Sequence, residues 1–374
     1  MNKSFRIISL WGIDLRVHIT FPLILAWAAL QFGIMFGSLA GAVFGIVAIS
    51  LLFVLVTLHE LGHSFAARAY DVPVKQIILT PIGGVAQLMR MPEKPEQELL
   101  IAIAGPAVNI VIALIMAALA MGVGIDIVTL LSTFSSLSGT TLLTLFSYIF
   151  VSNIFLALFN LIPAFPMDGG RILRALLAMR MNYARATNIA AGVGRIAAVL
   201  LGIYGLLNGN FFMIMIAIFI FGAGTQEARA TQARDTLQGY KVQQAFSTST
   251  YRLETWYTLQ QASNMMSYSG QKDFAVVSGD RLVGFLPYRV LQNALSTKPS
   301  YTPVSDVMIR NTRPVFPSTD LYTVQQRLVS EKIGALPVVS EGGGFEGIIS
   351  QSHIADLFRL VKSKPPIASG PQSI

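Results

Sequence analysis

Cysteine is absent from this chain of 374 residues, which excludes disulfide bonds and metal sites built on thiolates. Charged residues are also scarce, at 12%, about half the share of an ordinary soluble domain, whereas 53% of the residues are hydrophobic. Histidine occurs only four times. A chain of this composition is a membrane protein, and any metal that it binds must use histidine and carboxylate ligands.

The few charges are distributed unevenly along the chain. Residues 1–225 hold 12 of the 27 Lys and Arg and 8 of the 19 Asp and Glu, whereas the shorter remainder holds 15 and 11. This predicts a membrane domain at 1–225, a linker at 226–243, a soluble domain at 244–362 and a disordered tail at 363–374. The net charge of +8 divides evenly between the two parts without a Lys/Arg run, so no nucleic-acid partner is expected.

Apolar stretches in the first part predict about six transmembrane helices. They cover residues 19–37, 41–65, 99–123, 141–162, 189–207 and 211–225. Lys and Arg occur in every second loop between these spans and at both ends of the region, so they share one side of the membrane. The positive-inside rule then places both termini in the cytoplasm. We therefore expect an integral membrane protein, in a prokaryotic plasma membrane, whose soluble part is cytoplasmic.

The pattern H-E-x-x-H lies near the end of the second predicted span, at His59, Glu60 and His63. On a helix, residues four apart lie on one face, so both imidazoles can reach a single metal ion. Glu60 is placed to contact a metal-bound water without taking a coordination position. Burying these side chains in an apolar helix is costly unless they act together, so we predict a zinc site with Glu60 as the catalytic residue.

A second motif, N-x-x-P-x-x-P-x-D-G-G-R at residues 160–171, ends the fourth predicted span. Its prolines unwind a helix, and its glycine pair permits a close backbone approach. Asp168 is therefore either a third metal ligand or the N-cap of a following helix. The predicted topology brings Asp168, His59 and His63 to the same, cytoplasmic side of the membrane, which favours the ligand.

Two β-prone segments interrupt the helical pattern of the first part. Residues 5–18 predict a short hairpin at the membrane surface. Residues 74–90 form two arms around Gly83 and Gly84, which predict either a re-entrant or membrane-edge hairpin, whose edge strand can pair with an extended peptide, or a plain surface loop. Asn109, within the third predicted span, is either an interhelical contact or a polar lining of the site.

Together the motifs resemble the site-2 protease family of intramembrane zinc metalloproteases. H-E-x-x-H is followed by G-P-x-x-N at residues 105–109 and by the late aspartate motif, and the match covers most of residues 5–225. The resemblance implies a polytopic α-helical fold and hydrolysis of a peptide bond within a transmembrane segment of a single-pass membrane protein. The lipid bilayer and that substrate are then the expected partners.

The resemblance also assigns roles to individual residues. It implies one Zn²⁺ per chain, held by two histidines and an aspartate, and a glutamate that activates water, here His59, His63, Asp168 and Glu60. Asn160 matches a position implicated in holding substrate, and Asn160 or Asn109 could hydrogen-bond the substrate backbone or the developing oxyanion. The segment with Gly83 and Gly84 looks like the membrane-associated hairpin of the family.

The second part contains two similar blocks, residues 244–298 and 304–362. Each block predicts a helix, two strands joined by a turn, and a final helix, and such a repeat cannot bury its sheet alone, so the blocks must pair. They resemble a tandem CBS domain, a soluble α/β pair, which implies a homodimer or a docking module. Such pairs often bind adenine nucleotides, here near His353 and Pro337, although His353 stands where an acidic residue is usual.

Two classes of function remain open. The first is an intramembrane zinc endopeptidase with a cytoplasmic CBS pair for regulation or dimerisation. The second is a divalent-metal transporter gated by the CBS pair, in which the same side chains form a transit site. Many transporters contain an internal repeat with paired broken helices, and residues 1–225 contain only one proline-broken helix with an acid, which favours the protease. Intact Glu60 argues against an inactive relative.

Overall fold

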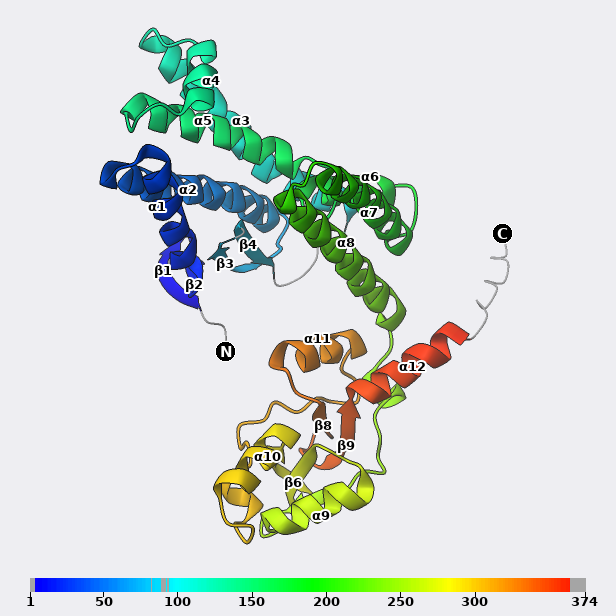
Figure 1. Ribbon diagram of the computed structural model, residues 1–374. Coiled ribbons are helices and arrows are strands. Elements are labelled where there is room, and N and C mark those ends of the chain that lie inside the picture. Colours follow the sequence, from blue (N-terminus) through cyan, green and yellow to red (C-terminus); the bar gives the residue numbers. More distant parts are fainter. Residues whose placement is uncertain (1–3, 82, 89–91, 93, 364–374) are drawn as a thin grey trace, which may run out of the picture. The chain divides into compact units, whose positions relative to one another are not determined.

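The computed structural model describes residues 4–81, 83–88, 92 and 94–363 (Figure 1). The chain forms two compact units, Met1–Thr231 and Gln232–Ile374. The segment predicted as a linker, 226–243, begins as a continuation of the last helix of the first unit. The predicted tail, 363–374, lies outside the described residues except for its first residue.

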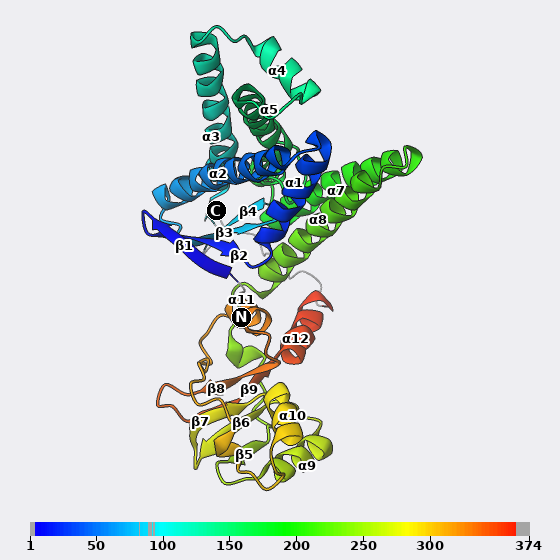
Figure 2. The same cartoon turned by 60° about the vertical axis from the view of Figure 1, so that its left-hand side comes forward.

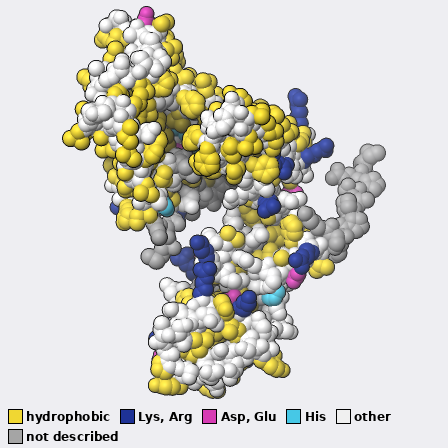
Figure 3. Space-filling model, in the orientation of Figure 1, with side chains coloured by type: hydrophobic (Ala, Val, Ile, Leu, Met, Phe, Trp, Pro, Cys, Tyr) yellow, Lys and Arg dark blue, Asp and Glu magenta, His cyan; other side chains and the backbone are white. Residues whose placement is uncertain are grey.

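The first unit is mainly helical. Its helices are α1 Phe21–Phe36, α2 Leu39–Ala69, α3 Pro95–Gly122, α4 Ile127–Ser136, α5 Leu142–Asn160, α6 Asp168–Ala178, α7 Tyr183–Leu207 and α8 Phe211–Leu237. Its strands are β1 Ser4–Leu10, β2 Ile13–His18, β3 Val74–Thr80 and β4 Gly83–Leu88. Hydrophobic side chains cover the outer surface of the helices, as contact with lipid requires (Figure 3).

Among the described residues, five helices are long and apolar enough to cross a membrane, namely α2, α3, α5, α7 and α8. The first predicted span is α1, which is apolar but has only 16 residues, short of the roughly 20 that the hydrocarbon core requires. Gly37 ends α1 early because it adopts the left-handed conformation, with φ at 60°. The polytopic helical fold is confirmed, and the expected six spans become five long ones and the shorter α1.

Glycines allow α1 and α2 to pack as a close hairpin. The Ser38 hydroxyl accepts a hydrogen bond of 3.1 Å from the N–H of Gly41 and begins α2. Farther along α2, a Cβ at Gly45 would lie 2.5 Å from the carbonyl oxygen of Ala28 in α1. Small residues at such interfaces let helix backbones approach closely, which is the main source of packing energy within a bilayer.

The four strands form one sheet in the order β1-β2-β3-β4, which lies along α2 in both views (Figures 1 and 2). The β1–β2 and β3–β4 pairs are antiparallel, and β2 and β3 are parallel. Buried side chains such as Ile13, Phe53 and Ile77 join the sheet to α2. Both predicted hairpins are confirmed, so residues 74–90 are not a plain loop, and β4 forms one edge of the sheet.

The second unit contains two copies of a helix–strand–strand–helix block. Their elements are α9 Leu259–Ser269, β6 Phe274–Ser278, β7 Arg281–Leu286 and α10 Tyr288–Thr297, then α11 Leu321–Glu331, β8 Ala335–Val339, β9 Phe345–Ser350 and α12 Gln351–Ser363. Strand β5 Arg252–Glu254 pairs with β6, and 3₁₀ turns at Val242–Gln244 and Val304–Asp306 precede the two blocks. Buried clusters around Val276 and Val338 form within the two blocks, and a third cluster of Phe285, Ala335 and Ile348 joins the blocks. The predicted α/β repeat and the pairing of its blocks are confirmed.

Candidate metal centre

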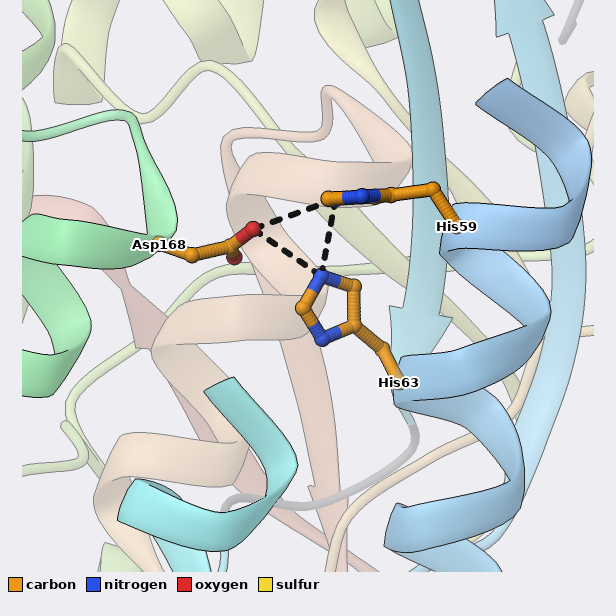
Figure 4. Close-up of side chains that lie close together, drawn as sticks. All are labelled: His59, His63 and Asp168. Atoms are coloured by element: carbon orange, nitrogen blue, oxygen red, sulfur yellow. Dashed lines mark hydrogen bonds and ion pairs between the residues drawn. The ribbon is translucent and has the colours of Figure 1, made fainter. Parts of the chain in front are cut away.

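Helices α2 and α6 bring three potential metal ligands together (Figure 4). His59 and His63 point from one face of α2 toward Asp168, the first residue of α6. Each histidine Nε2 lies 3.1 Å from Oδ2 of Asp168, and the two Nε2 atoms are 3.2 Å apart. All three side chains are buried. The structure therefore assembles the three residues that the sequence predicted as ligands.

The spacing of these three atoms suits a zinc ion. A point equidistant from them in their plane lies about 1.8 Å from each, and zinc–ligand distances of ~2.0–2.1 Å are reached ~1 Å out of that plane. Two imidazoles and one carboxylate are also a common donor set of zinc hydrolases, so the residues present fit the metal.

The outer nitrogens of both histidines are held by helix α3. Nδ1 of His63 lies 2.7 Å from the carbonyl oxygen of Ile101, and Nδ1 of His59 lies 2.6 Å from Oδ1 of Asn109. A Cβ at Gly105 would lie 2.3 Å from Nε2 of His63, so the absence of a side chain there makes room for the imidazole. These contacts direct both Nε2 atoms toward Asp168 and leave them available to a metal.

A tightly folded loop before α6 positions Asp168. A Cβ at Gly169 would lie 2.3 Å from the carbonyl oxygens of both Leu161 and Ile162, so the loop folds back directly on the start of the helix. Met167 occupies the N-cap position, and the Asp168 carboxylate faces the histidines instead of capping α6. The N-cap alternative is therefore excluded.

Glu60 is held against the edge strand β4. Its Oε2 accepts a hydrogen bond of 3.1 Å from the N–H of Ala86. A Cβ at Gly84 would lie 2.7 Å from Cγ of Glu60, so the glycine permits the strand to approach the carboxylate. The predicted glycine hairpin thus contacts the predicted catalytic residue directly.

These groups share one cavity of about 520 Å³. Its walls include the three potential ligands, Glu60, residues of β4 and the side chains of Asn160, Pro166 and Arg171. Asn160 donates from Nδ2 to the carbonyl oxygen of Leu156, 2.9 Å away. Asn109 does not line this cavity, because it is fully buried between His59 and Asn153. The structure therefore brings Asn160 to the cavity and separates Asn109 from it.

Sequence reasoning missed a buried ionic network next to the site. Arg174 on α6 is 1% exposed and Glu98 on α3 is 2% exposed, and Nε of Arg174 lies 3.0 Å from Oε1 of Glu98. The same guanidinium also pairs with Glu227 on α8 and lies 4.9 Å from the ring centroid of Phe165. In the sequence, only Glu98 could have indicated this network, because it is an acidic residue at the edge of an apolar span. Arg174 resembled an ordinary loop charge.

The two predicted nucleotide-binding positions, Pro337 and His353, lie on different elements of the second unit. Pro337 on β8 lines a cavity of about 230 Å³ together with Arg313 and Arg327. His353 is on α12 and is absent from the walls of that cavity. The structure therefore brings basic side chains to Pro337 and leaves His353 elsewhere.

Comparisons with known proteins agree with this geometry. The model of peptidase family M50 matches residues 47–201, and that of the CBS domain matches residues 304–359. A zinc metalloprotease of Methanocaldococcus jannaschii is 32% identical over 365 residues, which covers 97% of this chain and 98% of the relative. Stage IV sporulation protein FB of Bacillus subtilis is 25% identical over 222 residues, 59% of this chain and 66% of the relative.

Among solved structures, a site-2 protease from Methanocaldococcus jannaschii is 40% identical, with a TM-score of 0.45, and covers 60% of this chain and 95% of that structure. The similarity to the curated archaeal relative extends over nearly the full length of both chains. The chain therefore belongs to peptidase family M50, the site-2 proteases, and is an integral-membrane zinc metalloprotease that carries CBS domains.

Proposed function

We propose that this chain is an intramembrane endopeptidase that hydrolyses a peptide bond within a transmembrane segment of a single-pass membrane protein. One observation carries the proposal. The ligand atoms of His59, His63 and Asp168 converge on one cavity that is also lined by Glu60 and the edge of strand β4. Metal ligands, a potential base and an outermost strand are the parts that peptide hydrolysis requires.

His59, His63 and Asp168 would hold one zinc ion, which supplies a Lewis acid and a water of lowered pKa. The carboxylate of Glu60 is the general base. Its Oε2 is anchored by the N–H of Ala86, so the group is fixed beside the ligands, where it can take a proton from water and pass it to the leaving nitrogen. Arg171, with Nη1 3.9 Å from Oδ1 of Asp168, holds the second carboxylate oxygen of that ligand.

The edge of β4 is the proposed binding site for the scissile segment. β4 is the outermost strand of its sheet and lines the cavity, so an extended peptide can add to it through backbone hydrogen bonds. A transmembrane helix hides its carbonyl groups in i→i−4 bonds, so it must unwind before it can pair in this way. Asn160, on the same cavity wall, can donate its amide N–H to a substrate carbonyl or to the developing oxyanion.

For the second unit we propose a cytoplasmic regulatory module that also dimerises the chain in a prokaryotic plasma membrane. Lys and Arg occur in every second loop of the first unit, which supports the cytoplasmic placement by the positive-inside rule. The cavity beside Pro337 is lined by Arg313, Arg327 and Glu331, and Glu331 pairs with Arg327 at 3.2 Å. Arg313 is therefore the side chain in this cavity that supports an anionic ligand such as an adenine nucleotide.

The test is cleavage of a tagged single-span protein by the full chain in detergent, with zinc measured in every sample. Glu60→Gln should retain zinc and cut about 100- to 10,000-fold more slowly, because only the base is lost. Asp168→Ala should lose both zinc and cleavage. Glu96→Gln, an exposed acid at the start of α3, is the matched control and should behave as the wild type.

Retention of full cleavage by Glu60→Gln would refute the proposed base. Zinc binding without cleavage of several substrates, combined with zinc flux into liposomes, would refute the protease and support the transporter.

A further inference from the structure

We propose that Asn153, on α5, is a positioning residue that fixes the tautomer of His59 and thereby keeps Nε2 of that histidine available to zinc. The inference rests on the proposed metal site. Asn153 is fully buried and does not line the cavity, so it contacts neither substrate nor metal. It acts through Asn109, which lies between Asn153 and His59.

The hydrogen bonds have only one consistent direction, because they start from a backbone carbonyl. Nδ2 of Asn153 lies 2.7 Å from the backbone oxygen of Asn109, which can only accept. This contact turns Oδ1 of Asn153 toward the side chain of Asn109, whose Nδ2 donates to it across 2.6 Å. The remaining atom of the Asn109 amide, Oδ1, must then face His59.

The direction of these bonds determines where the proton of His59 lies. Oδ1 of Asn109 is an acceptor 2.6 Å from Nδ1 of His59, so Nδ1 must carry a proton. Nε2, which faces Oδ2 of Asp168 at 3.1 Å, is then the nitrogen whose lone pair zinc would take. Rotation of the Asn109 amide by half a turn would present an N–H to Nδ1 and move the proton to Nε2. A protonated Nε2 cannot bind a metal, so the orientation of one amide decides whether His59 is a ligand.

His63 does not need such a relay. Its Nδ1 lies 2.7 Å from the backbone oxygen of Ile101, which cannot be rotated into a donor. His59 has a side-chain amide at the equivalent place, and an amide has two possible orientations. Asn109 is fully buried, so water cannot correct a wrong orientation, and Asn153 is the described residue that removes the choice.

The first experiment measures zinc affinity by chelator competition on the full chain in detergent. Asn153→Leu keeps a similar volume but removes every polar atom, so the Asn109 amide is free to rotate. The dissociation constant for zinc should rise roughly 10- to 100-fold, the usual effect of losing a group that orients a metal ligand. Asn153→Ala is the second variant, because a smaller side chain cannot clash. Ser147→Ala, a buried polar change on the same helix, is the control and should bind zinc as the wild type.

The second experiment reads the tautomer itself by ¹⁵N NMR of histidine-labelled, metal-free protein at a pH where His59 is neutral. The chain has only four histidines, so His18→Gln and His353→Gln identify two of the signals, and His63→Gln distinguishes His59 from the remaining one. Because Oδ2 of Asp168 also accepts, 3.1 Å from Nε2 of His59, the informative signal is the proton on Nδ1. Wild type should carry that proton, whereas Asn153→Leu should lose part of its occupancy. A residue that served only packing would not change this signal.

Asn109→Asp provides the decisive background, because both atoms of a carboxylate are acceptors and rotation cannot present a donor to His59. In that background the outer carboxylate oxygen faces Oδ1 of Asn153, which is also an acceptor, so Asn153→Leu removes a repulsion and should not weaken zinc binding. The two changes are then not additive. An unaltered tautomer and an unaltered zinc affinity in Asn153→Leu and Asn153→Ala would overturn this inference. Wild type that binds no zinc would instead refute the proposed function.

Discussion

Adding a single methyl group at Gly105 should abolish the metal site without unfolding the protein. In Gly105→Ala, the new Cβ would lie 2.3 Å from Nε2 of His63 and 2.8 Å from Nε2 of His59, whereas ordinary contacts begin at 3.4 Å. Nε2 of His63 must therefore retreat by about 1.1 Å, several times the ~0.2 Å that metal–ligand distances tolerate. The imidazole cannot simply rotate away, because its Nδ1 is bound to the Ile101 carbonyl.

We expect the dissociation constant for zinc to rise at least about 100-fold, or about 2.7 kcal/mol, and cleavage to fall with it. The measurement is chelator competition together with cleavage of a tagged transmembrane substrate, and thermal unfolding should change little because alanine favours helix over glycine. Gly122→Ala, at the end of the same helix with no atom within 4 Å of the new Cβ, is the matched control. Wild-type zinc affinity in Gly105→Ala would refute the argument that this glycine makes room for the ligands.

Two further predictions concern stability. Arg174→Met leaves Glu98 buried without its partner, so the free energy of unfolding should fall by roughly 3–5 kcal/mol, and adding Glu98→Gln should recover part of it; thermal unfolding in detergent measures both, and a loss below ~1 kcal/mol would contradict the buried pair. In the second unit, burial raises the pKa of Asp273 above its ordinary value of 3.8, so the folded state favours the protonated form. The contribution of Asp273 to stability is then fully present below pH 3.8 and is lost as the pH rises through the folded pKa. Asp273→Asn should flatten the pH dependence in that window, measured by denaturant unfolding followed through Trp256 in a chain with Trp11→Phe and Trp27→Phe, and an unchanged slope would contradict it.

Local periodicity was enough to predict part of the site. His59 and His63 share a helix face because they are four residues apart, and Asp168 stood out as an acid on broken backbone within an apolar region. The two hairpins followed from β-prone segments around glycines. The signals for the histidines and the hairpins lie within a few residues of the chain, whereas the choice of Asp168 as a ligand also needed the predicted topology of the spans.

The remaining features depend on contacts between distant segments. Arg174 resembles an ordinary loop charge in the sequence, yet it is buried and pairs with Glu98 on α3 and Glu227 on α8. These partners are 76 and 53 residues away, so no local pattern reveals the burial. Asn153 is a polar residue in an apolar span, which is a signal, but its role depends on Asn109 in another helix. Asn109 shows the same limit, since the sequence could not decide between the cavity and an interhelical contact.

The position of β4 at the edge of its sheet has a consequence for substrate choice. The backbone N–H and C=O groups of a helical segment are bonded within the helix, so they cannot pair with a strand edge. The measured affinity of such a segment is therefore the affinity of its extended form multiplied by the fraction of time that it spends extended. A segment that is unwound about 1% of the time would bind about 100-fold more weakly than one already unwound. Under the proposed function, the enzyme would therefore discriminate between membrane proteins by the local stability of their helices, and a glycine or proline near the cleaved bond could count for more than any side chain that fits a pocket.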